Sequence, residues 1–353
     1  MSKKINIAIN GFGRIGRLLF KMALKNEEVE VVAINDLGDV ENMTYLLNYD
    51  TAQKSLLEIS DLKASFKVEE NKNFLIIGDK KIPFYSVKNP AELPWKDLSV
   101  DVVAECTGVF NSFEKSKAHL DAGAKRVVLS GPTKDAQNLE FAKGKIGSTV
   151  LMGINEEKTK TCSITSNGSC TTNASAIPLK IINDKIGIES ALLNTIHSYT
   201  ATQSIVDGPV RKKKDFRRGR AAAQNIIPTT TGSAIAVGKV IEEFQGKFDG
   251  IAIRVPTIAG SLVDLTFITK RDTSEEEIKN IFIEASQKNE YKNLLRVEDE
   301  PIVSSDIVGD TYPSIIDLNF IKVQGRLVKI LAWYDNESGF THSLLEHIIK
   351  IGR

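Results

Sequence analysis

The sequence predicts an α/β protein in which a doubly wound parallel sheet is joined to an α+β domain with a mostly antiparallel sheet. In the first part of the chain, short apolar runs alternate with stretches of helical periodicity, which is typical of a parallel sheet. After residue 170 the strand-like runs become longer and the helices are grouped between them, which favours an antiparallel sheet. A chain of 353 residues can build two such cores.

The first part begins with a strand–helix–strand unit. Residues 5–10 predict a strand, 11–16 a glycine-rich turn, 17–26 a helix and 29–35 a second strand, and the unit is long enough for parallel pairing. The same patterns predict an antiparallel hairpin over 65–87 that turns at Gly78-Asp79, strands over 100–106, 125–130 and 149–155, and a helix near 111–122.

The second part predicts longer strands and well-separated helices. The strands cover 187–198, 250–255, 261–270 and 320–334, and the last of these contains a hairpin turn at Gln324-Gly325. The helices cover 172–185, 233–244 and 273–288. Residues 339–351 are amphipathic and predict a C-terminal helix.

The composition limits the possible classes of protein. A net charge of +1 excludes a molecule built as a polycation for nucleic acid or membranes. Three cysteines do not make a disulfide framework, and they favour a reducing cytoplasm. We find no apolar signal region and no stretch long enough to span a bilayer, so we expect a cytoplasmic protein.

The glycine-rich turn is the first motif that carries chemistry. Gly11, Gly13 and Gly16 form a G-x-G-x-x-G that follows a strand and opens a helix, and Asp36 ends the next strand 20 residues after Gly16. Glycines let the backbone approach a pyrophosphate, and a carboxylate at this place accepts hydrogen bonds from ribose hydroxyls. The pattern predicts a Rossmann-type domain that prefers NAD to NADP, since Leu37 offers no cation for a 2′-phosphate.

Cys170 has the surroundings of a nucleophile. It lies in the run Ser169-Cys170-Thr171-Thr172-Asn173, where its neighbours are small and polar and helix-forming residues follow. A thiol at the start of a helix is expected to have a lowered pKa. Cys106 and Cys162 fit the alternative of buried structural cysteines.

His197 ends a strand and is followed by hydroxyl-bearing residues. A lone histidine at such a place is more often part of a core, but its neighbours favour a polar site that accepts anions. His119, His342 and His347 lie in helical stretches and are expected at the surface. A thiol, an imidazole and a dinucleotide fingerprint together predict oxidation of an aldehyde through a covalent thioester.

Residues 211–220 contain seven basic residues and one acidic residue. The run can be interpreted as a nucleic-acid patch, as a solvated loop, or as a loop that binds the phosphate of a substrate or cofactor. The near-neutral net charge weakens the first interpretation, and the run alone does not decide between the others.

Several segments, in order along the whole chain, together resemble the type I family of phosphorylating glyceraldehyde-3-phosphate dehydrogenases. They are residues 9–17, 169–173, 207–209, 223–228, 231–232, 254–257 and 334–337. The resemblance implies NAD-dependent oxidative phosphorylation of D-glyceraldehyde 3-phosphate to 1,3-bisphosphoglycerate in glycolysis or gluconeogenesis. The reaction would pass through a hemithioacetal and a thioester on Cys170, with His197 as its partner.

The resemblance also implies a domain plan and an assembly. Residues 1–169 and 336–353 would form the NAD-binding Rossmann domain, to which the C-terminal helix returns. Residues 170–335 would form the catalytic domain, with a long basic loop near 201–224 that lines the active site. The family implies a homotetramer, and neither a metal nor nucleic acid is required.

The family's site positions match residues of this sequence in three groups. The cofactor group contains Gly11, Gly13, Arg14, Ile15, Gly16, Asp36, Lys88, Ser130 and Asn336, and Leu37 with Pro209 matches the pair associated with NAD preference. The group for the substrate's own phosphate contains Thr200, Thr202 and Arg254. The group for inorganic phosphate contains Ser169, Thr171, Arg218, Thr231 and Gly232.

The sequence departs from the family in a few places, and alternatives remain. Ser338 and Phe340 stand where the family usually has Trp and Tyr, which could alter the affinity for the cofactor. Residues 65–95 and 133–147 look like surface elaborations. The alternatives are erythrose-4-phosphate dehydrogenase, which hydrolyses its thioester, a semialdehyde dehydrogenase, and an RNA- or surface-binding role for the basic loop.

Overall fold

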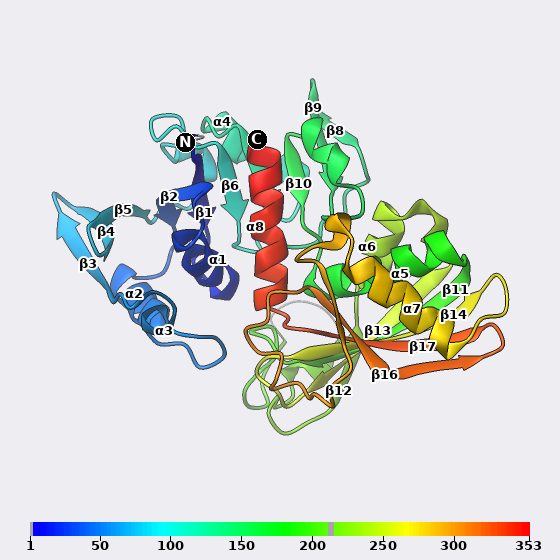
Figure 1. Cartoon of the computed structure of the whole chain (residues 1–353). Coiled ribbons are helices and arrows are strands. Elements are labelled where there is room, and N and C mark those ends of the chain that lie inside the picture. Colours follow the sequence, from blue (N-terminus) through cyan, green and yellow to red (C-terminus); the bar gives the residue numbers. More distant parts are fainter. Residues whose placement is uncertain (1–2, 211–214) are drawn as a thin grey trace. The chain divides into compact units, whose positions relative to one another are not determined.

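The computed structural model describes residues 3–210 and 215–353, so residues 211–214 of the basic run lie outside the described part (Figure 1). The chain divides into two compact units. The first contains Met1–Gly168 and Thr341–Arg353, and the second contains Ser169–Phe340. Among the described residues, no helix has both the length and the apolar character needed to cross a lipid bilayer.

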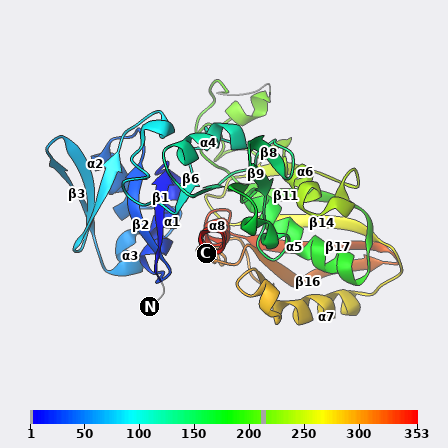
Figure 2. The same cartoon turned by 90° about the horizontal axis from the view of Figure 1, so that it is seen from above.

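The first unit is built on a sheet in the order β3-β4-β5-β2-β1-β6-β7-β10-β9-β8, and the pairs from β5 to β9 are parallel. The strands are β1 (Ile5–Asn10), β2 (Val29–Asn35), β3 (Ala64–Glu69), β4 (Lys72–Ile77), β5 (Lys80–Tyr85), β6 (Val102–Glu105), β7 (Arg126–Leu129), β8 (Leu139–Ala142), β9 (Lys145–Thr149) and β10 (Ile164–Ser166). The helices are α1 (Arg14–Leu24), α2 (Val40–Asn48), α3 (Leu56–Ser60) and α4 (Phe113–Asp121), and α2 packs beside β3 and β4 (Figure 2).

The chain changes direction across this sheet at β1. β2 pairs with one edge of β1 and β6 with the other, so the carboxyl ends of β1 and β6 form a topological switch point, where α/β proteins bind their ligands. Ile7 and Ile9 face one buried core and Ala8 faces a second, which explains why β1 has an almost continuous apolar run. α8 (Ser338–Gly352) begins in the second unit and ends in the first, where its apolar residues join the core around Ile7.

The second unit has a sheet in the order β12-β13-β11-β14-β17-β16-β15, in which four of the six pairs are antiparallel. The strands are β11 (Ile188–Ser198), β12 (Ile227–Thr230), β13 (Phe248–Val255), β14 (Ser261–Thr269), β15 (Leu295–Glu298), β16 (Ser314–Gln324) and β17 (Leu327–Tyr334). The helices α5 (Cys170–Lys185), α6 (Ser233–Val240) and α7 (Glu275–Ser286) cover one face (Figure 1). The predicted fold class is confirmed.

Several predicted elements differ from the structure for identifiable reasons. The strand predicted over 149–155 is wrong, because the Asn155 side chain accepts the N–H of Leu151 at 2.8 Å and donates to the carbonyl of Thr149 at 3.0 Å, which holds a turn. The predicted hairpin over 65–87 has three strands, since Glu70 and Asn71 adopt positive φ and make an additional turn. The helix predicted over 233–244 ends at Val240 and a short 3-10 helix follows.

Two histidines predicted at the surface are completely buried. Trp95 Nε1 donates to His119 Nδ1 at 3.0 Å, and His119 Nε2 lies 3.0 Å from Glu105 Oε2. His347 Nδ1 lies 3.1 Å from Asn167 Oδ1. The prediction was wrong because polar partners inside the unit, which helical periodicity does not reveal, bind both ring nitrogens of His119 and Nδ1 of His347. His342 is half-buried.

Candidate active site

The glycine-rich turn forms a cradle at the carboxyl end of β1. Gly11 has φ +96°, and a Cβ there would stand 2.6 Å from the backbone nitrogen of Thr107. A Cβ on Gly16 would stand 2.0 Å from the carbonyl oxygen of Gly11, whereas one on Gly13 would project into open space. Gly13 precedes α1 and offers no side chain to cap it, so a pyrophosphate can approach the start of this helix.

Asp36 is fixed beside this turn. Its Oδ2 accepts the N–H of Phe12 at 2.6 Å, and its Oδ1 accepts the N–H of Gly38 at 2.7 Å. The carboxylate therefore has a defined place between the end of β2 and the glycine turn, while Leu37 is exposed. An open glycine cradle and a held carboxylate fit the phosphates and the ribose of NAD.

The other predicted cofactor residues lie around the same sheet edge or in the second unit. Arg14 Nη1 pairs with Asp50 Oδ1 at 2.7 Å, Lys88 is exposed, and the N–H of Ser130 donates to the carbonyl of Glu105 at 2.9 Å. Asn336, in the second unit, is buried and accepts the hydroxyl of Ser261 at 3.0 Å.

Cys170 and His197 come together in the second unit. Cys170 is the first residue of α5, and the hydroxyl of Ser169 caps this helix by accepting the N–H of Thr172 at 3.1 Å. His197 is the penultimate residue of β11. The start of the helix and the end of the strand place Cys170 Sγ 3.4 Å from His197 Nε2.

His197 presents Nε2 to the thiol, and its Nδ1 lies beside Ser198 and Arg254. Its Nδ1 lies 2.6 Å from the carbonyl oxygen of Ser198, which can only accept, and 2.6 Å from Arg254 Nη1, which can only donate, so Nδ1 has a partner in either tautomer. Arg254 Nη1 donates to the same carbonyl at 2.8 Å. Burial, and then the positive charge of Arg254, lower the pKa of His197 to about 3, so the imidazole is neutral at physiological pH. In the tautomer whose Nδ1 donates to Ser198, Nε2 faces the thiol with a lone pair.

The pKa of Cys170 differs from the sequence-based expectation. Burial raises the pKa of its thiol, and this outweighs the opposing effects of the Arg254 charge and of hydrogen bonds from Thr171. The predicted lowering by the start of the helix is therefore wrong for the protein without ligand, because desolvation acts on the whole thiolate charge. Burial also raises the pKa of Cys106 to about 12 and raises that of Cys162.

Two groups of polar side chains include residues that adjoin this pair in the sequence or contact it. In the first, Thr200 Oγ1 lies 2.9 Å from Thr202 Oγ1, and Arg254 has a buried Nε without a partner among the described residues. In the second, the hydroxyl of Ser233 lies 3.1 Å from that of Ser169 and 3.0 Å from that of Thr231. Both groups offer hydrogen-bond donors that suit an anion.

Two predicted phosphate ligands have other contacts in this structure. Arg218 Nε donates to Thr229 Oγ1 at 2.9 Å and its Nη2 to the carbonyl of Thr230 at 3.2 Å, next to the predicted ligand Thr231. The hydroxyl of Thr171 is buried and lies 2.9 Å from that of Tyr334. Gly232 caps α6 without a side chain, which leaves the start of this helix accessible to an anion.

Comparison with known proteins identifies both halves of the chain. Residues 5–113 match the family model of the glyceraldehyde 3-phosphate dehydrogenase NAD binding domain, and residues 169–336 match the model of its C-terminal domain. The chain belongs to the glyceraldehyde-3-phosphate dehydrogenase family.

The matches to individual members of this family extend over nearly the full chain. Glyceraldehyde-3-phosphate dehydrogenase 1 of Kluyveromyces lactis is 43% identical over 349 residues, which are 98% of this chain and 99% of the relative. The cytosolic enzyme of Magnolia liliiflora is 43% identical over 99% of this chain and 97% of its own length. Glyceraldehyde-3-phosphate dehydrogenase 3 of Saccharomyces cerevisiae is 42% identical over 98% of this chain and 99% of its own length.

Sequence reasoning missed several residues of the site in this dehydrogenase chain. The hydroxyl of Tyr334 shares a hydrogen bond of 2.8 Å with that of Thr195. The Tyr334 ring packs edge-on against the His197 ring, with the ring centroids 5.9 Å apart. Ser233 joins the two hydroxyls of the second group, and Gln203 contacts Thr200 and Thr202. A serine directly after Gly232 was a usable signal. Tyr334 lies in the segment 334–337 that resembles the family, but its contact with Thr195, 139 residues away in the sequence, could not be predicted.

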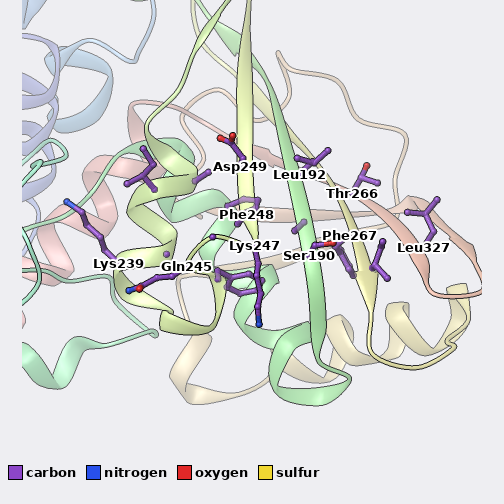
Figure 3. A pocket seen from close by; sticks show the side chains of 17 residues that line it. Ser190, Leu192, Lys239, Gln245, Lys247, Phe248, Asp249, Thr266, Phe267 and Leu327 are labelled. Carbon is purple, nitrogen blue, oxygen red and sulfur yellow. The ribbon is translucent and has the colours of Figure 1, made fainter.

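A hollow of about 810 Å³ in the second unit lies apart from this chemistry (Figure 3). It is bordered by α6, β11, β13 and β14, and residues such as Leu192, Phe248 and Leu327 line it. None of the predicted catalytic or phosphate-binding residues contributes to its lining.

Proposed function

We propose that the protein is an NAD-dependent, phosphorylating glyceraldehyde-3-phosphate dehydrogenase. It would convert D-glyceraldehyde 3-phosphate and inorganic phosphate to 1,3-bisphosphoglycerate, with reduction of NAD. The observation that carries the proposal is the 3.4 Å approach of Cys170 Sγ to His197 Nε2 between two hydroxyl-rich groups, in a chain of this family. Such a thiol–imidazole pair is the arrangement that covalent catalysis on a carbonyl requires.

The first unit would hold the cofactor. Gly11, Gly13 and Gly16 shape the approach for the pyrophosphate, and Asp36 would accept the ribose hydroxyls. The backbones of Arg14 and Ile15, together with Lys88, Ser130 and Asn336, are the further candidates from the family's pattern. Bound NAD would supply the acceptor for a hydride.

Cys170 and His197 would carry the covalent steps. Sγ attacks the aldehyde carbon, and His197 Nε2 passes the thiol proton to the carbonyl oxygen, which gives a hemithioacetal. Backbone N–H groups at the start of α5 would hold this oxygen. As the hydride leaves the carbon, His197 takes the hydroxyl proton back and the thioester forms.

Inorganic phosphate would complete the reaction. One of its oxygens attacks the thioester carbon, the C–S bond breaks, and the departing sulfur recovers its proton from His197. The candidates for holding this phosphate are Ser169, Arg218, Thr231, Gly232 and the backbone of Thr171. Thr200, Thr202 and Arg254 would hold the phosphate that the substrate already carries, and the buried Nε of Arg254 supports that role because it needs an acceptor.

The deciding experiment follows NADH absorbance with glyceraldehyde 3-phosphate, with and without inorganic phosphate. We expect strong dependence on phosphate, and loss of activity by on the order of 10³-fold or more in Cys170→Ala, because no other group forms the covalent bond. His197→Asn should retain binding of NAD but lose on the order of 10²- to 10⁴-fold in kcat.

The same assay separates the alternative functions. Turnover without phosphate, and a preference for erythrose 4-phosphate, would replace the proposal with the hydrolysing activity. No turnover of either substrate would contradict both. We further propose a homotetramer in the cytoplasm.

A further inference from the structure

Gln203 is a buried residue in an otherwise exposed loop. Ala201 and Thr202 are exposed, but Gln203 is only 7% exposed. Its Oε1 accepts the backbone N–H of Thr200 at 2.8 Å, which fixes the orientation of the amide, because only the oxygen can accept. Its own N–H donates to the carbonyl of Thr200 at 2.9 Å and closes the turn.

The same amide oxygen is shared by the two threonine hydroxyls. Thr200 Oγ1 lies 3.1 Å and Thr202 Oγ1 3.4 Å from Gln203 Oε1, and the two hydroxyl oxygens are 2.9 Å apart. Since the amide oxygen has two lone pairs, it cannot satisfy three donors fully. The backbone bond is the shortest of the three contacts, so the hydroxyl protons are the ones that can turn to an incoming acceptor while their oxygens stay in place.

The donor end of this amide is also available. Gln203 Nε2 is buried and finds no partner among the described residues. A buried donor without an acceptor is unfavourable and rare in folded proteins, so a protein that retains one has a reason to keep it. The Nε of Arg254 is a second buried donor without a partner among the described residues. Arg254 belongs to the residues predicted to bind the substrate's phosphate, and Gln203 contacts the other two, Thr200 and Thr202.

We infer that Gln203 is a positioning residue for the substrate's phosphate, acting by holding the Thr200 and Thr202 oxygens side by side. This inference rests on the proposed function. Without the amide acceptor, the Thr200 backbone and both side chains lose their common anchor, and an anion must order them on binding. The effect should depend on whether the substrate carries a phosphate.

The test compares kcat/KM for glyceraldehyde 3-phosphate with kcat/KM for unphosphorylated glyceraldehyde. Gln203→Met removes the hydrogen bonds at similar volume and should lower the ratio of the two values about five- to tenfold, through a higher KM for the phosphorylated substrate. Gln203→Glu keeps an acceptor but adds a negative charge, and should lower the ratio further, most strongly at low salt. Gln224→Met, a change to an exposed glutamine of the same loop region, should leave the ratio at the wild-type value.

Each result bears on one hypothesis. An unchanged ratio in Gln203→Met, or an equal fall of both kcat/KM values, would overturn the inference, because a merely structural role affects both substrates alike. Combining Gln203→Met with Thr200→Val should lower the ratio by less than the product of the two separate losses, since both variants remove the contact between Thr200 Oγ1 and Gln203 Oε1. If the wild-type protein itself shows no preference for the phosphorylated substrate, the proposed function fails and Gln203 is not the cause.

Discussion

Opposing effects act on the Cys170 thiol within a few ångströms. Burial raises its pKa, while the charge of Arg254 and hydrogen bonds from Thr171 lower it. The same arginine lowers the pKa of His197, so it favours a thiolate and a neutral base at the same time. Arg254 is therefore expected to influence the nucleophile as well as to bind a phosphate.

Changing Arg254 to Met should make Cys170 less reactive in the absence of substrate. The loss of the cation removes an effect that lowers the thiol pKa, so the fraction of reactive thiolate at a given pH falls. The measurement is the rate of alkylation by iodoacetamide, a neutral reagent, between pH 7 and 10. We expect several-fold slower alkylation near pH 8 and a profile displaced to higher pH.

The matched control is Arg220→Met, because Arg220 is exposed and pairs with Asp207. This variant should alkylate like the wild type. If Arg254→Met reacts as fast as the wild type throughout the pH range, the charge of Arg254 does not act on the thiol.

At this scale, sequence reasoning could find the residues whose chemistry is rare in the chain. Cys170 and His197 stood out by their neighbours, and the structure brings their side chains together. The direction of the Cys170 pKa could not be predicted, because it depends on burial by segments distant in the sequence. Gln203 and Tyr334 were missed because common residue types reveal a role only through their contacts.

The glycine turn and α1 provide a test at the scale of one element. Gly13→Ala should leave stability near that of the wild type, since its Cβ meets nothing within 4 Å, but should raise the Kd for NAD about tenfold or more by obstructing the pyrophosphate. Gly16→Ala should instead destabilise the first unit, because its Cβ would stand 2.0 Å from the carbonyl oxygen of Gly11. Calorimetric titration with NAD and thermal melts measure the two effects. Wild-type affinity in Gly13→Ala would contradict this account of the cradle.

His347 makes the stability of α8 depend on pH. Burial lowers the pKa of His347 from 6.5 to about 3. Between these values the unfolded chain binds a proton that the folded chain does not, so the free energy of unfolding falls as the pH drops below 6.5. The stability that depends on a neutral His347 is fully present above pH 6.5 and is lost progressively as the pH falls toward 3.

Changing His347 to Asn should remove this dependence while keeping a donor toward Asn167. The variant should be less stable than the wild type at pH 7, owing to the lost ring, but the gap should shrink by about 2 kcal/mol between pH 6.5 and 5. Urea unfolding of both proteins at these two pH values gives the comparison. Parallel pH dependences would show that His347 does not control acid sensitivity.

The elements themselves were mostly predictable, because long apolar runs and helical periodicity dominate their sequences. The strand at 29–35 and the C-terminal helix agree closely with β2 and α8. The prediction of a strand over 149–155 failed because the Asn155 side chain bonds the backbone of Leu151 and Thr149 and holds this apolar run in a turn. The prediction that His119 and His347 lie at the surface failed for a related reason. Helical periodicity does not reveal hydrogen bonds inside a core.

On the scale of the whole molecule, the sheet of the second unit has an apolar face that its own helices do not cover. α5, α6 and α7 pack on one face of this sheet. On the strands β11, β13 and β17, Leu192 is 63% exposed, Ile251 53% and Leu327 47%. Pairing aligns Leu192 with Thr266, and Ile268 with Leu327, so these side chains belong to the face opposite the buried Val263, Leu265 and Phe267.

Such a face is costly in water and suits self-association, which supports the proposed tetramer. Leu192→Asp places a charge on this face and should shift the protein to dimers or monomers at micromolar concentration. Mass photometry or light scattering coupled to size exclusion measures the change. Leu57→Asp is the matched control, since Leu57 is similarly exposed (55%) but lies on α3 of the first unit. If Leu192→Asp retains the mass of the wild type while folding normally, assembly does not use this face, and a monomeric wild type would exclude the tetramer itself.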